Sequence, residues 1–417
     1  MDAEILAAVA AEEAAMADLL AELVEAPTPL GEEAGGQAIM RRAFADLGLE
    51  PFDVPLDTAA LAGHPGAAPF GWDVAGKANV LADWEPAAPG DGRTLILNGH
   101  IDVVSPEPAA LWSGPPFAAR RDGDWIYGRG AGDMKSGLAA MVGAVRGLRR
   151  LDLAPRGRVQ LQSVVEEECT GNGALACVLA GHTADAAILT EPTRGAIWNA
   201  QVGVLWFQIR VVGLPAHAGD APEGANAIEA SMRVIEALRS LEADLNAVKP
   251  PLYAAYPHPI NLNVGMIRGG DWPSTVAGEC VTHFRLALYP GERVADLRQR
   301  IEETVAGVAA PSTFRFDVVY EGFACEGYEL APDAPLVSRL TDAAERATGR
   351  RPQLFASTAT TDARSFQLYG DTPAVCFGPV AEHEHGVDER VYMPSVTETA
   401  QAIALFIGDW CGLERRG

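Results

Sequence analysis

Positive charge is scarce in this sequence. The 417 residues contain 32 lysines and arginines but 56 aspartates and glutamates, which gives a formal net charge of -24. A chain with this balance repels polyanions, so nucleic acid is not an expected partner. The same charge would attract divalent cations, but acidity that serves solubility alone is the simpler interpretation. The net charge alone therefore does not indicate whether the protein binds divalent cations.

Cysteine is scarce as well, and long apolar runs are lacking. The six cysteines form no CxxC pair and no dense framework like that of small secreted domains, so we expect reduced thiols. No segment reaches the roughly 18 uninterrupted apolar residues that a membrane span needs. The N-terminal residues lack the basic and apolar segments of a signal peptide. We therefore expect a cytoplasmic protein without membrane association.

The hydrophobic pattern predicts an α/β protein. Hydrophobic residues make up 48% of the chain, enough for sizeable cores. Short apolar runs alternate with helical patterns from about residue 78 to 191, which indicates a mixed, mostly parallel sheet with flanking helices. The pattern resumes with a helix near 335–348, a strand at 374–377 and a helix near 396–410.

A different pattern lies between these two parts. It predicts a strand at 202–212, a helix at 226–241, strands at 261–267 and 280–288, a helix at 293–308 and a strand at 313–320. This βαββαβ order is typical of a ferredoxin-like unit. We therefore expect one α/β domain, residues 1–199 and 323–417, interrupted by a smaller domain at residues 200–322.

Polar residues follow the predicted strands of the larger domain. The clearest example is the apolar strand that ends in His100 and is followed by Asp102. Open α/β sheets bind ligands at the carboxyl ends of their strands. One imidazole nitrogen can bind a metal while a nearby carboxylate holds the other N–H. A lone His-x-Asp pair often arises by chance, so this motif alone is weak.

A glycine-rich bend at residues 128–132 places Asp133 just before a helix that starts near Ser136. The bend resembles a dinucleotide-binding fingerprint, but the glycines lead directly into an acid. A phosphate-binding loop instead presents backbone N–H groups to an anion. Nicotinamide binding is therefore not expected.

Acidic residues end two further apolar strands: Glu166, Glu167 and Glu168 follow one, and Glu191 follows the other. A run of charges is usually a solvated face. Three acids where a core strand meets a glycine-containing turn are costly, however, unless cations compensate them.

A fifth segment, residues 378–389, holds His383 and His385, and a histidine-rich acidic loop after a strand is a credible source of metal ligands. All five segments lie at the carboxyl ends of strands in one predicted sheet. Two imidazoles and three carboxylates suit a pair of zinc, cobalt or manganese ions.

The ordered motifs resemble the di-zinc peptidases and deacylases, a family that includes acetylornithine deacetylase, succinyl-diaminopimelate desuccinylase, aminoacylase and the glutamate carboxypeptidases. In that family a His-x-Asp-x-Val strand end, a Gly-Arg-Gly-x-x-Asp-Met-Lys bend, an Asp/Glu-Glu-Glu triplet, a Glu-Pro and a final His-x-x-x-Glu occur in this order. The resemblance covers nearly the whole chain. This sequence departs from it at Glu166, where aspartate is commoner, and at Ser105, where proline is frequent. Neither departure removes a ligand.

The resemblance implies two divalent metal ions per chain, zinc first, with cobalt or manganese as alternatives. By position, His100 and Glu191 would bind one metal, Glu168 and His385 the other, and Asp133 would bridge them. His385 is preferred to His383 because only His385 is followed four residues later by an acid, Glu389.

The resemblance also implies roles for residues that do not bind metal. Asp102 would support His100, and Glu167 would be the general base and acid. The inserted domain would be a lid and dimerisation domain whose His217 reaches the partner's active site, although an ordinary surface histidine is the simpler interpretation. Further substrate contacts would be Asn263, Arg285 and Arg364. Surface or structural roles are equally consistent for these arginines.

The predicted function is hydrolysis of the amide bond of an N-acyl amino acid by a metal-activated water. A dipeptidase or a glutamate-type carboxypeptidase is the closest alternative. A protein that binds metal and ligand without catalysis is an alternative of another class, because a fold alone does not prove catalysis.

Overall fold

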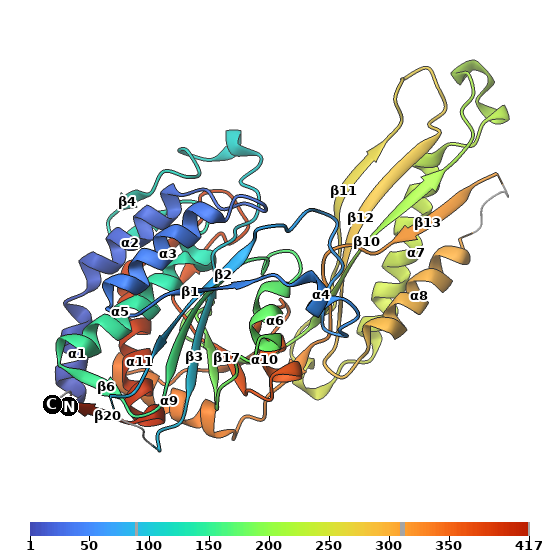
Figure 1. The fold of residues 1–417 in the computed structure, drawn as a ribbon. Helices are drawn as coiled ribbons and strands as arrows, with labels where there is room; N and C mark the ends of the chain where they lie inside the picture. Colours follow the sequence, from blue (N-terminus) through green and yellow to red (C-terminus); the bar gives the residue numbers. More distant parts are fainter. Residues whose placement is uncertain (88–90, 309–312, 416–417) are drawn as a thin grey trace.

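The computed structural model describes residues 1–87, 91–308 and 313–415 (Figure 1). Its larger sheet has nine strands in the order β1-β2-β7-β3-β8-β17-β9-β15, with β16 beside β9. These strands are β1 (Phe52–Pro55), β2 (Ala78–Trp84), β3 (Leu95–His100), β7 (Val159–Val164), β8 (Ala187–Leu189), β9 (Ile197–Gln201), β15 (Tyr328–Glu329), β16 (Leu354–Ser357) and β17 (Ala374–Cys376). The four central strands β7, β3, β8 and β17 are parallel, and antiparallel pairs flank them. The predicted mixed, mostly parallel sheet is confirmed.

Helices cover both faces of this sheet. On one face lie α5 (Ser136–Arg150), α11 (Met393–Cys411) and α9 (Pro335–Thr348), with α1 (Asp2–Ala10) and α2 (Glu13–Glu25) outside them. On the other face lie α6 (Asn172–Leu179) and α10 (Ala363–Tyr369). Successive residues of β3 serve opposite cores, because side chains alternate along a strand. Thus Leu97 packs with α5 and α11, whereas Ile96 packs with α6 and α10.

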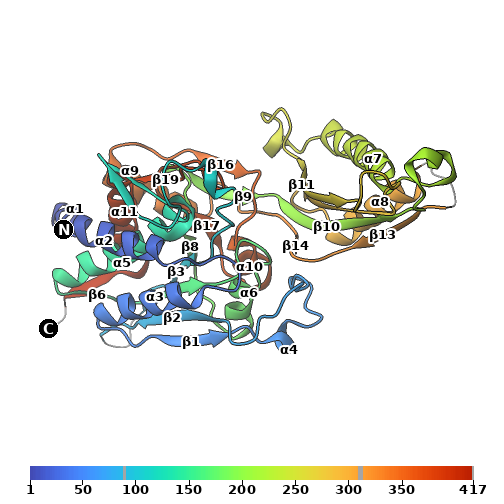
Figure 2. The ribbon, with the colours of Figure 1, turned by 90° about the horizontal axis from the view of Figure 1, so that it is seen from above.

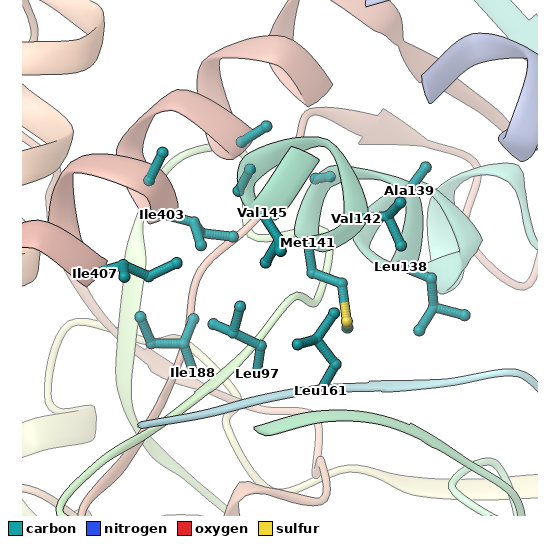
Figure 3. Packing of buried hydrophobic residues seen from close by; sticks show 14 of the residues in the cluster. Leu97, Leu138, Ala139, Met141, Val142, Val145, Leu161, Ile188, Ile403 and Ile407 are labelled. Atoms are coloured by element: carbon teal, nitrogen blue, oxygen red, sulfur yellow. The ribbon is translucent and has the colours of Figure 1, made fainter. Parts of the chain in front are cut away.

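Helix α5 lies at the centre of the larger core. Its apolar residues recur at helical spacing, so one stripe faces the sheet. Figure 3 shows Met141 and Val145 of α5 pointing toward Leu97 of β3 and Ile188 of β8. Truncating one such buried side chain to alanine costs about 2–5 kcal/mol of stability. This packing fixes the start of α5 against the strand ends that carry the predicted ligands.

Smaller elements complete the larger part: α3 (Ala34–Asp46), α4 (Thr58–Leu61), a four-stranded sheet of β18 (Ala381–Glu382), β19 (Arg390–Tyr392), β5 (Trp125–Tyr127) and β4 (Arg120–Asp122), and a pair of β6 (Leu153–Pro155) and β20 (Leu413–Arg415). Within the described residues, no helix has both the length and the apolar composition that crossing a bilayer requires. The six cysteines are buried and free, as expected for thiols.

A second, five-stranded sheet projects from the larger part (Figures 1 and 2). Its chain order is β10 (Gly203–Val212), α7 (Ala227–Ala247), β11 (Leu262–Gly269), β12 (Glu279–Leu288), α8 (Val294–Ala306) and β13 (Arg315–Val319). The strands pair antiparallel in the order β11-β12-β10-β13, and the short β14 (Ala324–Cys325) also pairs with β10. The predicted βαββαβ order is confirmed. The division into two domains at residues 199/200 and 322/323 stays a prediction.

Burial alternates along β10, as expected for a sheet with helices on one face only. Phe207 and Ile209 are buried with α7 and α8, whereas Trp206 and Gln208 are half-buried on the opposite face. This open face begins near the larger sheet and lines a cavity described below.

Candidate metal centre

The sheet topology brings the predicted ligands together. His100 is the last residue of β3, and its register partner on β7 is Val164, just before the acidic triplet. On the other side of β3, Asn98 pairs with Leu189 of β8, just before Glu191. Neighbouring parallel strands therefore end at one edge, where open α/β sheets bind ligands.

Asp133 lies between the two predicted ligand histidines. Its Oδ1 is 3.1 Å from Nε2 of His100, and its Oδ2 is 3.3 Å from Nε2 of His385. Glu191 Oε2 lies 3.9 Å from the His100 nitrogen, and Glu168 Oε2 lies 3.1 Å from the His385 nitrogen. The five residues thus form two groups that share one carboxylate, which is an arrangement suited to two cations.

The electrostatics of this cluster fit metal binding. Burial, above all, raises the pKa of Glu191 well above its usual value, and neighbouring carboxylates add to this. The charge of Glu168 is the main cause that raises the pKa of His385 to about 11. In the described part of the chain, Oε1 of both Glu168 and Glu191 has no hydrogen-bond partner. Buried carboxylate oxygens without partners are costly, and divalent cations would satisfy them. Nitrogen and oxygen donors of this kind suit zinc, cobalt or manganese.

Asp102 connects His100 to the acidic triplet. Its carbonyl oxygen accepts a hydrogen bond from Nδ1 of His100 at 2.8 Å, which leaves Nε2 facing the cluster. Its carboxylate accepts from the backbone N–H groups of Glu167 and Glu168, at 3.2 and 2.9 Å. We expected the carboxylate to hold the imidazole N–H, but the carbonyl does so and the carboxylate stands 3.8 Å away.

Glu167 is the remaining acid beside the cluster. Its side chain is nearly buried, and Oε2 lies 3.9 Å from Nε2 of His100. Burial is the main cause that raises its pKa well above the usual value, and Glu191 and Asp362 raise it further. A buried carboxylate with a raised pKa is suited to accept and return a proton.

Two buried acids with positioning roles were not predicted from the sequence. Glu389 accepts from the backbone N–H groups of Gly130, Gly132 and Asp133 and from the guanidinium of Arg129. It therefore holds the bend that presents Asp133, and its place four residues after His385 was a usable signal.

Glu166 is the second such acid. It is fully buried and accepts from Nζ of Lys77 at 2.5 Å and from Nε1 of Trp72 at 3.0 Å. Its backbone adopts a positive φ of 70°, an uncommon conformation outside glycine. Glu166 therefore anchors the turn from which Glu167 and Glu168 project.

A cavity of about 540 Å³ lies between the open face of the five-stranded sheet and the five predicted metal ligands, which are called the metal cluster from here on. Glu168 and His385 line one side, and Asn263 and Arg285 line the other. Asn263 of β11 and Arg285 of β12 are register partners. The fold thus brings two of the three predicted substrate contacts to the predicted ligands.

Arg285 is half-buried, and desolvation is the main cause that lowers its pKa. It donates to the carbonyl oxygen of Thr358 at 3.3 Å. Among the residues that the structure describes, no carboxylate lies within ion-pair distance of it. A partly desolvated guanidinium without an acidic partner costs free energy, and an anion bound beside it would reduce that cost.

The third predicted contact, Arg364, lies outside this cavity. It is buried and donates to the carbonyl oxygens of Thr361 and Thr170, at 2.6 and 3.0 Å. A substrate role for Arg364 stays a prediction that its geometry does not favour, because these bonds already hold its guanidinium.

His217 lies beyond the far end of β10 and is exposed. Its Nδ1 accepts from the backbone N–H of Gly219 at 3.0 Å. The ten residues of β10 span roughly 30 Å at ~3.3 Å per residue. The structure therefore does not bring His217 to the cluster of its own chain. His383, the alternative ligand, is exposed and makes no contact with the cluster in the described structure.

Known proteins resemble the chain in sequence. The family model for peptidase family M20/M25/M40 matches residues 96–409. The chain is 30% identical over 369 residues to N-formyl-4-amino-5-aminomethyl-2-methylpyrimidine deformylase from Halalkalibacterium halodurans, covering 82% of this chain and 86% of that protein. It is 27% identical over 404 residues to succinyl-diaminopimelate desuccinylase from Dinoroseobacter shibae, covering 94% and 98%.

Solved structures share the fold. Human carnosine dipeptidase 1 superposes with a TM-score of 0.79 at 16% identity, covering 99% of this chain and 100% of that chain. A dinuclear metal-binding peptidase of family M20 from Bacillus subtilis gives a TM-score of 0.63 at 17% identity, covering 96% and 99%. The family match, which includes the ordered motifs, decides the assignment: this chain belongs to the metal-dependent peptidase family M20/M25/M40 and is a hydrolase that acts on amide bonds.

Proposed function

We propose that the chain hydrolyses N-acyl amino acids, releasing the acyl group as a carboxylate together with the free amino acid. The observation that supports this most is Arg285, a half-buried cation that faces the cavity beside the metal cluster without an acidic partner in the described structure. The α-carboxylate of an N-acyl amino acid would supply that partner, because guanidinium pairs with carboxylate through two parallel hydrogen bonds. Asn263, on the neighbouring strand, offers an amide to the same end of the substrate.

We propose that two divalent ions bind per chain, zinc first, with cobalt or manganese as alternatives. His100, Glu191 and Asp133 would hold one ion, and His385, Glu168 and Asp133 the other. When bound, such a pair supplies a water that is acidic enough to attack at neutral pH and polarises the scissile carbonyl.

Glu167 would act as the general base and then as the general acid. Its Oε2 would take the proton of the attacking water and deliver it to the departing amine, a leaving group that cannot leave as an anion. Asp102 holds the backbone N–H of Glu167, so it keeps the base in place beside His100.

We also propose that the chain forms a homodimer through the five-stranded sheet. Strand β11 is an edge of that sheet and exposes Met266 and Ile267, while α7 exposes Met232. An apolar edge strand is a template for pairing with another chain. A two-fold pairing would carry His217 of each chain toward the partner's metal cluster, where it would donate a hydrogen bond to the developing oxyanion.

A dipeptidase or glutamate-type carboxypeptidase is the alternative, because a dipeptide offers the same amide and the same free carboxylate to Arg285. The pyrimidine substrate named for the Halalkalibacterium relative has no carboxylate and would leave Arg285 unpaired.

A substrate panel tests the proposal. It contains N-acetyl, N-formyl and N-succinyl amino acids, dipeptides and the N-formyl pyrimidine, and each N-acyl amino acid has a matched carboxamide. Release of amine from the acids, with the carboxamides at least tenfold slower and all activity lost with a chelator, would support the proposal. Equal rates for acids and carboxamides, or turnover of dipeptides alone, would reject it.

A further inference from the structure

A second cavity of about 710 Å³ also opens onto the metal cluster. Glu167, Glu191 and His385 line it at one end, and Trp198 and Phe355 line it further away. It shares His385, Ala359 and Thr360 with the cavity that contains Arg285. The cluster therefore stands where two cavities meet, so an amide held there projects one substituent into each.

The second cavity has an aromatic wall built from two neighbouring strands. Trp198 of β9 and Phe355 of β16 are register partners, and their ring centroids are 5.9 Å apart with a 35° tilt. Tyr256 packs edge-on against Phe355 at 5.8 Å and donates its hydroxyl to the carbonyl oxygen of Ala356 at 2.7 Å. Phe355 is 39% exposed. The wall is thus held in place but leaves apolar ring surface for another group.

The backbone also fixes the distance between this wall and the metal cluster. Trp198 follows Glu191 by seven residues, through a segment tied to the loop that leads to His385. Thr193 accepts from the backbone N–H of Gly378 at 2.9 Å and donates to the carbonyl oxygen of Ala196 at 2.6 Å. A group that rests on the wall therefore has a defined position relative to the reacting amide.

We infer that this second cavity is the acyl pocket and that it selects aromatic acyl groups. The inference rests on the proposed function, because Arg285 must hold the α-carboxylate in the first cavity for the acyl group to enter the second. A planar ring on the acyl carbon would pack against Trp198 and Phe355 and remove their exposed apolar surface from water. The substrate class is then an N-aroyl or N-arylacetyl amino acid.

Arg194 also lines this cavity and could bind a different kind of acyl group. Its side chain is 57% exposed and lies 3.9 Å from Glu384. A carboxylate on the acyl group, as in a succinyl amide, would use this arginine instead of the aromatic wall. A preference for aromatic acyl groups would depend on Trp198 and Phe355, whereas a preference for acyl groups with a carboxylate would depend on Arg194.

Three substrates that share one amino acid distinguish them: N-acetyl-, N-benzoyl- and N-succinyl-alanine. We expect kcat/KM to favour the benzoyl substrate over the acetyl substrate by roughly 10- to 100-fold. Phe355→Ala and Trp198→Ala should remove most of this preference, mainly by raising KM for the benzoyl substrate. Trp198→Phe, which keeps a ring, should retain part of it. Because Phe355 is partly exposed, its variant tests the wall even where Trp198→Ala does not fold.

Trp206→Ala is the matched control, because Trp206 lines the first cavity and not the second. It should leave the benzoyl-to-acetyl ratio unchanged. The aromatic pocket would be overturned if the benzoyl-to-acetyl ratio of kcat/KM stayed unchanged in Phe355→Ala. It would also be overturned if the enzyme preferred the succinyl substrate and Arg194→Gln abolished that preference. Absence of turnover on all three substrates, with dipeptides cleaved, would instead reject the proposed function.

Discussion

The two sheets of this molecule carry their polar residues in different ways. On the nine-stranded sheet, the predicted ligands sit at strand ends, where parallel neighbours finish together. On the five-stranded sheet, single polar residues such as Arg285 and Asn263 stand on the open face of strands whose other face packs on helices. The first arrangement gathers acidic and histidine side chains at one edge of the sheet. The second distributes single polar side chains over the face of a sheet.

The two sheets also carry polar groups of opposite charge that lack partners. Carboxylate oxygens of Glu168 and Glu191 are buried without hydrogen-bond partners, and Arg285 is a half-buried cation without a carboxylate at ion-pair distance, both within the described residues. Buried groups of this kind cost stability unless a ligand completes them. Cations on one side and a substrate carboxylate on the other would complete both, so damage to the two sides should have different consequences.

The largest expected effect lies within the acidic triplet. Glu167→Gln should retain about two metal ions per chain and lower kcat by about 10²- to 10⁴-fold, because it removes a proton acceptor. Glu168→Gln should instead lower the metal content, because it removes a proposed ligand oxygen that lies beside His385. Metal analysis together with steady-state kinetics separates the two variants. Identical metal content and identical kinetics would show that the base and the ligand are wrongly assigned.

The next effect concerns His217, which sits on the smaller sheet but is proposed to serve the partner's cluster. His217→Ala should lower kcat by about 10²- to 10³-fold, as for the loss of an oxyanion donor. Mixing it with Glu167→Gln and allowing subunits to exchange would pair each damaged chain with the other. A mixed dimer then contains one complete site, made from the intact Glu167 of one chain and the intact His217 of its partner.

Random exchange makes about half of the dimers mixed, each with one good site of two, so activity should recover to roughly a quarter of wild type. Each variant mixed with itself under the same conditions serves as the control. No recovery after verified exchange would place His217 in its own chain's chemistry or outside the reaction.

A smaller effect is expected at Arg285. Arg285→Lys keeps the charge but loses the paired hydrogen bonds, so KM for N-acyl amino acids should rise about 10- to 100-fold with little change in kcat. Arg364→Lys is the comparison, because its guanidinium donates to backbone carbonyls and lies outside the cavity. Arg364→Lys should lower the free energy of unfolding and change KM little. A KM unaffected by Arg285→Lys would contradict the carboxylate assignment.

The sequence indicates which residues lie at the ends of strands, because strand ends are local features. The residues His100, Glu168 and Glu191 each follow an apolar run, and parallel pairing alone brings them to one edge. The supporting contacts were not predictable in this way. Lys77 reaches Glu166 across 89 positions, and Glu389 reaches Gly130 across 259. No local pattern specifies such partners, because they depend on how separate loops pack.

Local sequence patterns also could not distinguish which of the predicted substrate contacts lines a cavity. Arginine at 285 and at 364 looks alike in a sequence, yet one lines a cavity and the other is enclosed by backbone carbonyls. The wall of Trp198 and Phe355 also escaped prediction, because it exists only where β9 and β16 pair. Polar residues at the ends of apolar strands carry a strong sequence signature, whereas residues that shape a cavity do not.

The smallest expected effect is on the stability of the smaller sheet. Glu242 of α7 is nearly buried and accepts from the backbone N–H of Leu262, the first residue of β11, at 2.7 Å. It also accepts from His258 at 3.0 Å and from Arg239 at 2.9 Å. Burial opposes ionisation, but these three donors together hold the pKa of Glu242 below its usual value. Glu242→Gln should lower the free energy of unfolding by about 1–3 kcal/mol.

The pH dependence of this loss follows from the lowered pKa of Glu242. A carboxyl with a lower pKa in the folded state stabilises the fold above its unfolded pKa of about 4.3, and that contribution disappears as the pH falls through the folded value. The stability gap between wild type and Glu242→Gln, measured by urea unfolding, should therefore be full at pH 7 and shrink below about pH 4. The exposed Glu236 on the same helix gives a control, because Glu236→Gln should change stability by less than about 0.5 kcal/mol at any pH. A gap that stays constant from pH 7 to pH 3 would mean that the charge of Glu242 contributes nothing to the attachment of α7 to β11.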